Sequence, residues 1–223
     1  MRRNYTMNLE ELKKQANAEN EKKEIIGNLQ EEVIAKFEEF FTAMDTSYPL
    51  WNAKMKETVN MFVADFEKYF SANGFDIKVA MPLTDEQYGL LEATYKELKF
   101  ILSNVNYDQE SFGLLKDGRG IAEFTFGCPE GTPNYFAWKD LLVVNKTRLV
   151  DMNGNVKDIY KKFVSKFTTE EELKLLEKKI EINIKHFQDA IEAVNDTDLC
   201  IFCETEKGHS VCKDFAEFIA QIG

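Results

Sequence analysis

Two stretches in the N-terminal third of the chain repeat apolar residues every three or four positions, the spacing of one face of an α-helix. The apolar positions are Ile26, Leu29, Val33, Phe37, Phe40, Phe41 and Met44 in the first stretch, and Trp51, Met55, Val59, Phe62, Val63, Phe66, Tyr69 and Phe70 in the second. The sequence DTSYP at residues 45–49 interrupts the pattern, and Asn73-Gly74 offers a left-handed cap for the second helix. We therefore predict two antiparallel helices, a helical hairpin over residues 25–74.

The segment before these helices, residues 1–24, is almost wholly polar. Leu9 and Leu12 are the only large aliphatic side chains after Met7, so the segment has helix-forming residues but no apolar face to bury. We expect it to be mobile in isolation, and to order as a helix on a partner or as an extension of the following helix.

After the hairpin the pattern changes to strands. Apolar and polar residues alternate over residues 75–81, which predicts a strand that ends at Pro82. The sequence TDEQ at residues 84–87 is a capping box, and it predicts a helix that continues to Leu102.

The middle of the chain has the turn chemistry of hairpins. The segments 111–116 and 120–127 flank the turn sequence Asp117-Gly118-Arg119-Gly120, a hairpin signal, and Asn153-Gly154 is a second one. We therefore expect residues 75–167 to hold a mixed region with the central sheet. Residues 156–166 fit either a helix or a strand.

The last part of the chain, residues 168–223, combines helices with one strand. Thr168-Thr169 stands before three glutamates and caps a long helix. Its apolar face comprises Leu173, Leu176, Ile180, Ile184, Phe187, Ile191 and Val194. DLCIFCE at residues 198–204 predicts a strand, and KDFAEFIAQI at residues 213–222 predicts a C-terminal helix.

These elements together predict an α+β fold, with amphipathic helices packed around a mainly antiparallel sheet and a helix-rich N-terminal region. The 223 residues include 44% hydrophobic residues and 18 Phe, enough for a sizeable core. We expect residues 25–223 to form a single domain.

Charge and cysteine usage restrict the partners and the compartment. Acidic residues outnumber basic ones by 39 to 28, a net charge of −11, which argues against direct binding of nucleic acid or of anionic membranes. No signal peptide or transmembrane run is evident, and four cysteines are too few for a disulfide framework. These features favour a cytoplasmic protein.

The stretch CIFCETEKGHSVC, residues 200–212, raises the question of a metal. Three thiolates and one imidazole are a common zinc ligand set, and their order resembles that of a zinc knuckle, although the spacing around the histidine differs. The candidate ligands are Cys200, Cys203, His209 and Cys212.

A metal-free interpretation explains the same residues and is favoured. Ile201 and Cys203 would face one side of a strand and Phe202 the other, residues 206–209 would form a turn, and Ser210 would cap the last helix. We therefore predict no metal and no cofactor, with zinc as the alternative.

Catalytic signatures are missing from the sequence. It contains neither a P-loop, nor GxGxxG, nor a Gly-x-Ser-x-Gly elbow, and it has only two histidines. Carboxylate pairs are plentiful, but they fall on polar helix faces or at helix starts, where charge is expected. We therefore predict that the protein is not an enzyme, with a carboxylate-dependent hydrolase as one alternative.

The acidity is concentrated near the C-terminus, where eight acidic residues from Asp189 onward stand against two lysines. If the acidic side chains share one face, they form a patch complementary to a basic surface that binds nucleic acid. We therefore predict a non-enzymatic inhibitor that binds such a surface of another protein, as acidic inhibitors encoded by phages and mobile elements do. The other alternative is a zinc-stabilised adaptor protein.

The predicted partner-binding residues come from two segments. Four belong to the acidic tail, and two are aromatic residues that follow the loop CPEGTP, where Tyr and Trp are suited to anchor an interface. They are Glu204, Glu206, Asp214, Glu217, Tyr135 and Trp138.

Overall fold

The computed structural model describes residues 9–79, 91–106, 111–135 and 156–222. The chain divides into two compact units. Unit 1 consists of Met1–Ser47 and Tyr135–Asp189, and unit 2 consists of Tyr48–Asn134 and Ala190–Gly223. Each unit is therefore built from two separate stretches of sequence.

One continuous helix, α1 (Leu9–Ala72), takes the place of the predicted helical hairpin, so that prediction is wrong. The helix continues through Pro49, which has no amide hydrogen for the carbonyl of Asp45, a loss that costs a helix interior about 3 kcal/mol. Burial beside the proline offsets this cost, because the large side chain of Trp51 is completely buried. The Trp51 indole also donates a hydrogen bond of 3.0 Å to the carbonyl of Ala190.

The helical period in fact crosses the interruption. Met44, Ser47, Trp51 and Met55 follow one another at intervals of three and four residues, and all four side chains are buried. Ser47 concealed the continuity because a polar residue occupies a core position. The polar residues 9–24 are helical and exposed, and they extend the helix that follows, one of the forms predicted for this segment.

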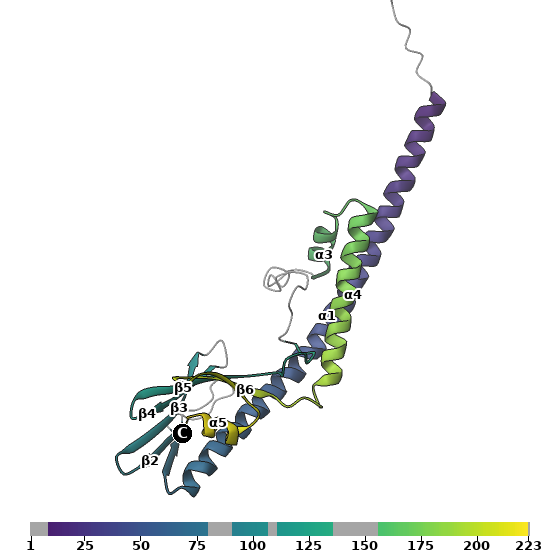
Figure 1. Ribbon diagram of the computed structural model, residues 1–223. Coiled ribbons are helices and arrows are strands. Elements are labelled where there is room, and N and C mark those ends of the chain that lie inside the picture. The colour runs from purple at the N-terminus through teal and green to yellow at the C-terminus, as the bar shows by residue number, and fades with distance from the viewer. Residues whose placement is uncertain (1–8, 80–90, 107–110, 136–155, 223) are drawn as a thin grey trace, which may run out of the picture. The chain divides into compact units, whose positions relative to one another are not determined.

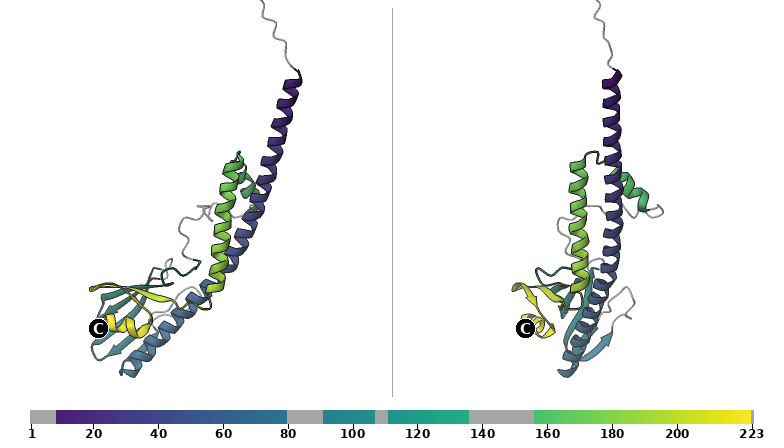
Figure 2. Two further views of the ribbon diagram at one scale, coloured as in Figure 1. Left: turned by 45° about the vertical axis from the view of Figure 1, so that its right-hand side comes forward. Right: turned by 90° about the vertical axis from the view of Figure 1, so that its right-hand side faces the viewer.

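Unit 1 is helical and contains the first part of α1, α3 (Val156–Val164) and all but the last turn of α4 (Glu170–Ala193). In the two views of Figure 2, α4 lies alongside α1. Tyr160 of α3 stacks on Phe37 and Phe41 of α1, with ring centroids 5.2 and 4.9 Å apart. The ambiguous segment 156–166 is thus mostly helical and contributes to the core of unit 1.

The predicted start of α4 is confirmed by its hydrogen bonds. The Thr169 hydroxyl accepts a bond of 3.3 Å from the amide of Glu172, whose carboxylate accepts one of 3.2 Å from the amide of Thr169. This reciprocal pair satisfies amides that have no partner inside the helix. The hydroxyl of Thr169 is also the main reason that the pKa of Glu172 is lowered.

Unit 2 contains a seven-stranded antiparallel sheet in which neighbouring strands are also consecutive in sequence. The strands are β1 (Asp76–Val79), β2 (Leu91–Tyr95), β3 (Leu98–Asn106), β4 (Ser111–Lys116), β5 (Arg119–Gly127), β6 (Cys200–Thr205) and β7 (Gly208–Cys212). Within this unit the sheet lies beside the C-terminal part of α1 (Figure 1). The helices and this sheet confirm the predicted α+β fold.

The helix predicted to run to Leu102 is wrong, because β2 and β3 form a hairpin there. Leu91 and Ala93 are buried and alternate with more exposed residues, which is the two-residue period of a strand. The turn places Lys96 at a φ of 54°, a left-handed conformation that ends helix propagation. The capping box at residues 84–87 lies outside the described residues.

The hairpin predicted at residues 117–120 is confirmed, with a turn of only two residues, Asp117 and Gly118, because β5 already begins at Arg119. Both residues have positive φ angles, 50° and 81°, as a two-residue turn of type I′ requires. The Asp117 carboxylate also accepts a hydrogen bond of 2.9 Å from the amide of Lys99, which links the turn to β3. The second hairpin signal, Asn153-Gly154, lies outside the described residues.

Phenylalanine side chains hold the sheet of unit 2 to its helices. Phe62 of α1 contacts rings from β5 and from α5 (Phe215–Ile222). Its ring partners are Phe124, Phe126, Phe215 and Phe218, at centroid distances of 4.9, 5.4, 5.2 and 5.3 Å. One face of the sheet is therefore packed on helices, and the other, the outer face, is not part of this core. None of the helices in the described ranges is long and apolar enough to span a membrane.

Candidate functional site

The cysteine-rich stretch forms a β-hairpin followed by a helix. The predicted strand is β6, with Ile201 and Cys203 buried on the inner face and Phe202 on the outer face, as expected. The prediction that Ser210 caps the last helix is wrong, because Ser210 lies in β7 opposite Cys203. The cap is Asp214, whose carboxylate accepts a hydrogen bond of 2.9 Å from the amide of Glu217.

The hairpin register separates the four candidate zinc ligands. Cys203 and Cys212 are buried on the inner face, whereas His209 pairs with Glu204 on the outer face. Cys200 has the same strand parity as the outer-face residues and lies at the first position of β6. Residues on opposite faces of a sheet cannot surround one ion, and among the described residues no group of three or more His, Cys, Asp or Glu side chains is placed to hold a metal.

This arrangement predicts that metal removal leaves the fold unchanged. Burial raises the pKa of Cys203 to about 11, and it is the first cause of the raised pKa of Cys212, so both thiols are protonated at neutral pH. Dialysis against a zinc chelator should leave the thermal unfolding midpoint where it was. One equivalent of zinc that survives gentle purification, and is lost in Cys200→Ser, would contradict this arrangement.

Two of the predicted acidic residues lie on the hairpin and have side-chain partners. Glu204 lies 3.8 Å from the Nδ1 atom of His209, and Glu206 forms an ion pair with Arg119. Glu204 and His209 border a shallow hollow of about 450 Å³ on the outer face of the sheet. An exposed ion pair such as that of Glu206 with Arg119 contributes about 0–1 kcal/mol.

The other two predicted acidic residues stabilise the start of α5. Asp214 is its cap, and the Glu217 carboxylate accepts a hydrogen bond of 2.9 Å from the amide of Lys213. Because α5 packs on the inner face, these carboxylates and Glu204 do not make one surface. The aromatic Tyr135 belongs to unit 1, where its ring lies 5.8 Å from that of Phe187, and Trp138 lies outside the described residues.

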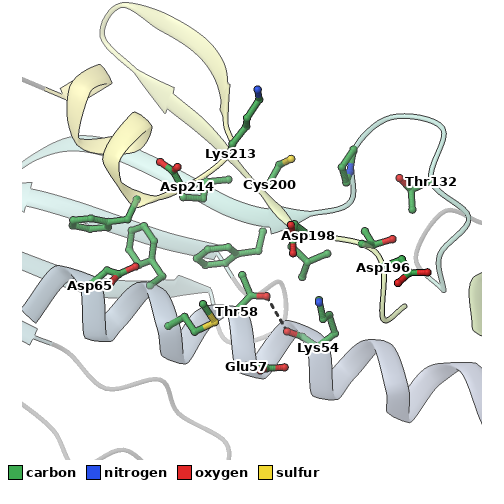
Figure 3. A pocket seen from close by; sticks show the side chains of 18 residues that line it. Lys54, Glu57, Thr58, Asp65, Thr132, Asp196, Asp198, Cys200, Lys213 and Asp214 are labelled. Carbon is green, nitrogen blue, oxygen red and sulfur yellow. Dashed lines mark hydrogen bonds between the residues drawn. The ribbon is translucent and has the colours of Figure 1, made fainter. Parts of the chain in front are cut away.

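A larger feature of unit 2 is an open cleft of about 920 Å³. One wall is the exposed side of α1, where Met61 lines the cleft. Figure 3 shows Glu57 and Asp65 on the same helix. The opposite wall is formed by the chain that enters β6, by the loop after β5 and by the start of α5. The base consists of apolar side chains, which are Phe62, Phe126, Leu199, Ile201 and Phe215.

The cleft has an excess of negative charge. Five carboxylates and two lysines line it, and no ion pair involves any of these seven residues within the described part of the chain. The carboxylates belong to Glu57, Asp65, Asp196, Asp198 and Asp214, all of which are exposed, and the lysines are Lys54 and Lys213. The Lys213 side chain points away from α1, so it does not neutralise the acidic residues of that wall (Figure 3).

The thiol of Cys200 is exposed to this negative field. Burial raises its pKa, and the carboxylates of Asp198 and Glu217 raise it further, while Lys213 acts in the opposite direction. Two carboxylates and one ammonium group thus act on this thiol, and their combined effect disfavours its negatively charged form. A thiol with a raised pKa is a poor nucleophile at neutral pH, so Cys200 is not suited to catalysis.

The sequence prediction missed most of this site. Asp214 was among the predicted partner-binding residues, and Asp196 and Asp198 belonged to the predicted acidic tail, but the acidic residues of α1 were not predicted. The residue that could have indicated this site in the sequence is Met61, an apolar residue outside the apolar stripe of α1. In the structure its side chain is 62% exposed. Glu57 and Asp65 stand four positions before and after it, so all three side chains share one face of the helix.

The chemistry of the cleft favours binding over catalysis. General acid–base work by carboxyl groups depends on burial or on a closely paired second carboxylate, and all five carboxylates here are exposed. Exposed negative charge around an apolar base is suited instead to a cationic, partly apolar ligand.

The chain matches no protein-family model, no curated protein and no solved structure.

Proposed function

We propose that the protein binds a basic segment of another protein in this cleft and acts as a non-enzymatic inhibitor of that partner. The observation that carries the proposal is the set of exposed carboxylates around an apolar base, and none of these carboxylates forms an ion pair in the described part of the chain. Complementary charge steers the encounter of two proteins and suppresses partners of the wrong sign. The apolar base then adds affinity that does not depend on salt.

A partner that handles nucleic acid fits this charge best. Such proteins carry clustered Lys and Arg side chains that bind the phosphate backbone. Carboxylates held on a folded surface can form ion pairs with those side chains in place of the phosphates. The net charge of −11 also attracts a positively charged partner. The four free cysteines are compatible with the reducing cytoplasm, where we place the protein.

The test is a titration with a fluorescent peptide that copies a lysine- and arginine-rich nucleic-acid-binding arm. Binding should weaken as salt is raised, and duplex DNA should compete with the protein for the peptide. The double variant Asp65→Lys/Asp198→Lys should bind at least about tenfold more weakly, because each side chain changes from attracting to repelling a cation.

A matched control is Glu67→Lys/Glu192→Lys, which changes the net charge by the same amount at exposed positions that do not line the cleft. Its affinity should stay within about threefold of the parent, since screened charges away from the site act weakly. Equal losses in both double variants would show that only the net charge matters, and the cleft would then have no role.

A further inference from the structure

Resting on this proposed function, we infer that the cleft recognises an extended segment of the form cation–x–apolar–x–cation, in which the apolar side chain covers Met61 and the two cations meet Glu57 and Asp65. The geometry of one wall of the cleft sets the spacing of these three side chains.

Glu57, Met61 and Asp65 form a stripe with a spacing of four residues on the exposed side of α1. Such residues lie on one face of a helix, one above the other. Carboxylates therefore stand on both sides of a single exposed apolar side chain. Met61 is 62% exposed although it lies beside the buried Phe62.

The distance along this stripe sets the register of the ligand. Eight residues of an α-helix advance about 12 Å, so Glu57 and Asp65 are separated by about that length along the axis of α1. An extended chain advances about 3.3 Å per residue, and its side chains at positions i, i+2 and i+4 point the same way. Cations four positions apart thus span about 13 Å, with the residue midway between them placed at Met61.

An extended ligand also agrees with the nature of basic segments. Clustered like charges repel one another, so a lysine- and arginine-rich segment is extended before it binds and loses less freedom on binding in that form. The flexible thioether of Met61 can adapt to either an aliphatic or an aromatic side chain. Carboxylates of the facing wall, Asp198 among them, add attraction for the same cations.

The test compares three labelled peptides of equal charge with Gly and Ser spacers. The first contains Arg-Gly-Leu-Gly-Arg, the second has its two arginines adjacent, and the third has Ser in place of Leu. The first should bind about tenfold more tightly than either of the others. Met61→Gln should weaken binding of the first peptide about fivefold, at low and at high salt alike, and leave binding of the Ser peptide unchanged.

The control for Met61→Gln is Leu175→Gln, which removes a similarly exposed apolar side chain, 56% exposed, from unit 1. Equal thermal unfolding midpoints will show that both variants fold. If all three peptides bind alike and all are weakened by Asp65→Lys/Asp198→Lys, the proposed function stands and this inference is overturned. A helical peptide with Arg, Leu and Arg at intervals of four, binding more tightly than the first, would also overturn it. If no peptide binds, both proposals fail.

Discussion

Phe62→Ala should destabilise unit 2 by about 3–5 kcal/mol, the usual cost of removing a buried aromatic side chain from a core that cannot collapse around the gap. Phe62 is 5% exposed, and its ring contacts four other phenylalanine rings. These rings come from β5 and α5, so the substitution removes a contact shared by the helix, the sheet and the C-terminal segment.

Urea unfolding followed by the fluorescence of Trp51, in a Trp138→Phe background, measures this loss within unit 2. Phe62→Leu keeps most of the volume and should cost less than about 1.5 kcal/mol. Phe202→Ala removes a phenylalanine that is 38% exposed on the outer face and should cost about 1 kcal/mol. A cost for Phe62→Ala no larger than that for Phe202→Ala would contradict the assigned core.

Tyr160→Ala should destabilise unit 1 by about 3–5 kcal/mol, whereas Tyr160→Phe should stabilise it by about 1 kcal/mol. The ring is stacked on Phe37 and Phe41, so its removal leaves a cavity. The hydroxyl is buried and has no hydrogen-bond partner in the described part of the chain. On folding it loses its hydrogen bonds to water and gains none in return, so removing it should stabilise the folded state.

The pH dependence gives a second test of the same residue. Burial raises the pKa of Tyr160, and the nearby carboxylates of Asp45 and Glu38 raise it further. The unfolded chain therefore loses this proton at a lower pH than the folded protein, so the stability linked to Tyr160 is present below pH about 10 and is lost as the pH rises further. Tyr160→Phe should unfold less readily than the parent at alkaline pH, measured by amide hydrogen exchange in unit 1. An alkaline profile identical to that of the parent would show that the hydroxyl is solvated.

Helices and turns were predictable from the sequence where apolar periodicity and the capping or turn residues agree. They were predicted wrongly where these two kinds of signal conflict. The start of α4 and the Asp117-Gly118 hairpin were predictable because local chemistry decides them. Residues 45–49 have the composition of a turn, since Pro49 normally ends a helix, but long-range burial of Trp51 outweighs that local cost. The apolar spacing up to Leu102 suits a helix as well as a strand, and only the pairing of β2 with β3 decides between them.

The candidate site could be predicted only in part, because a cleft brings together residues distant in sequence. The concentration of acidic residues after Asp189 pointed to the right region of unit 2. It could not show that Glu204 faces away from Asp214, since that depends on the register of β6 with β7. The contribution of α1 was hidden because an acidic residue on the polar face of a helix is the expected case.

The most direct test of the central claim is a map of amide chemical shifts of the isotope-labelled protein as the basic peptide is added. The proposed cleft predicts that the largest changes fall on Glu57, Met61 and Asp65 of α1 and on the facing residues Asp198 and Asp214. Changes that gather instead around Glu204 and His209 on the outer face of the sheet, or that spread evenly over all acidic residues, would contradict it.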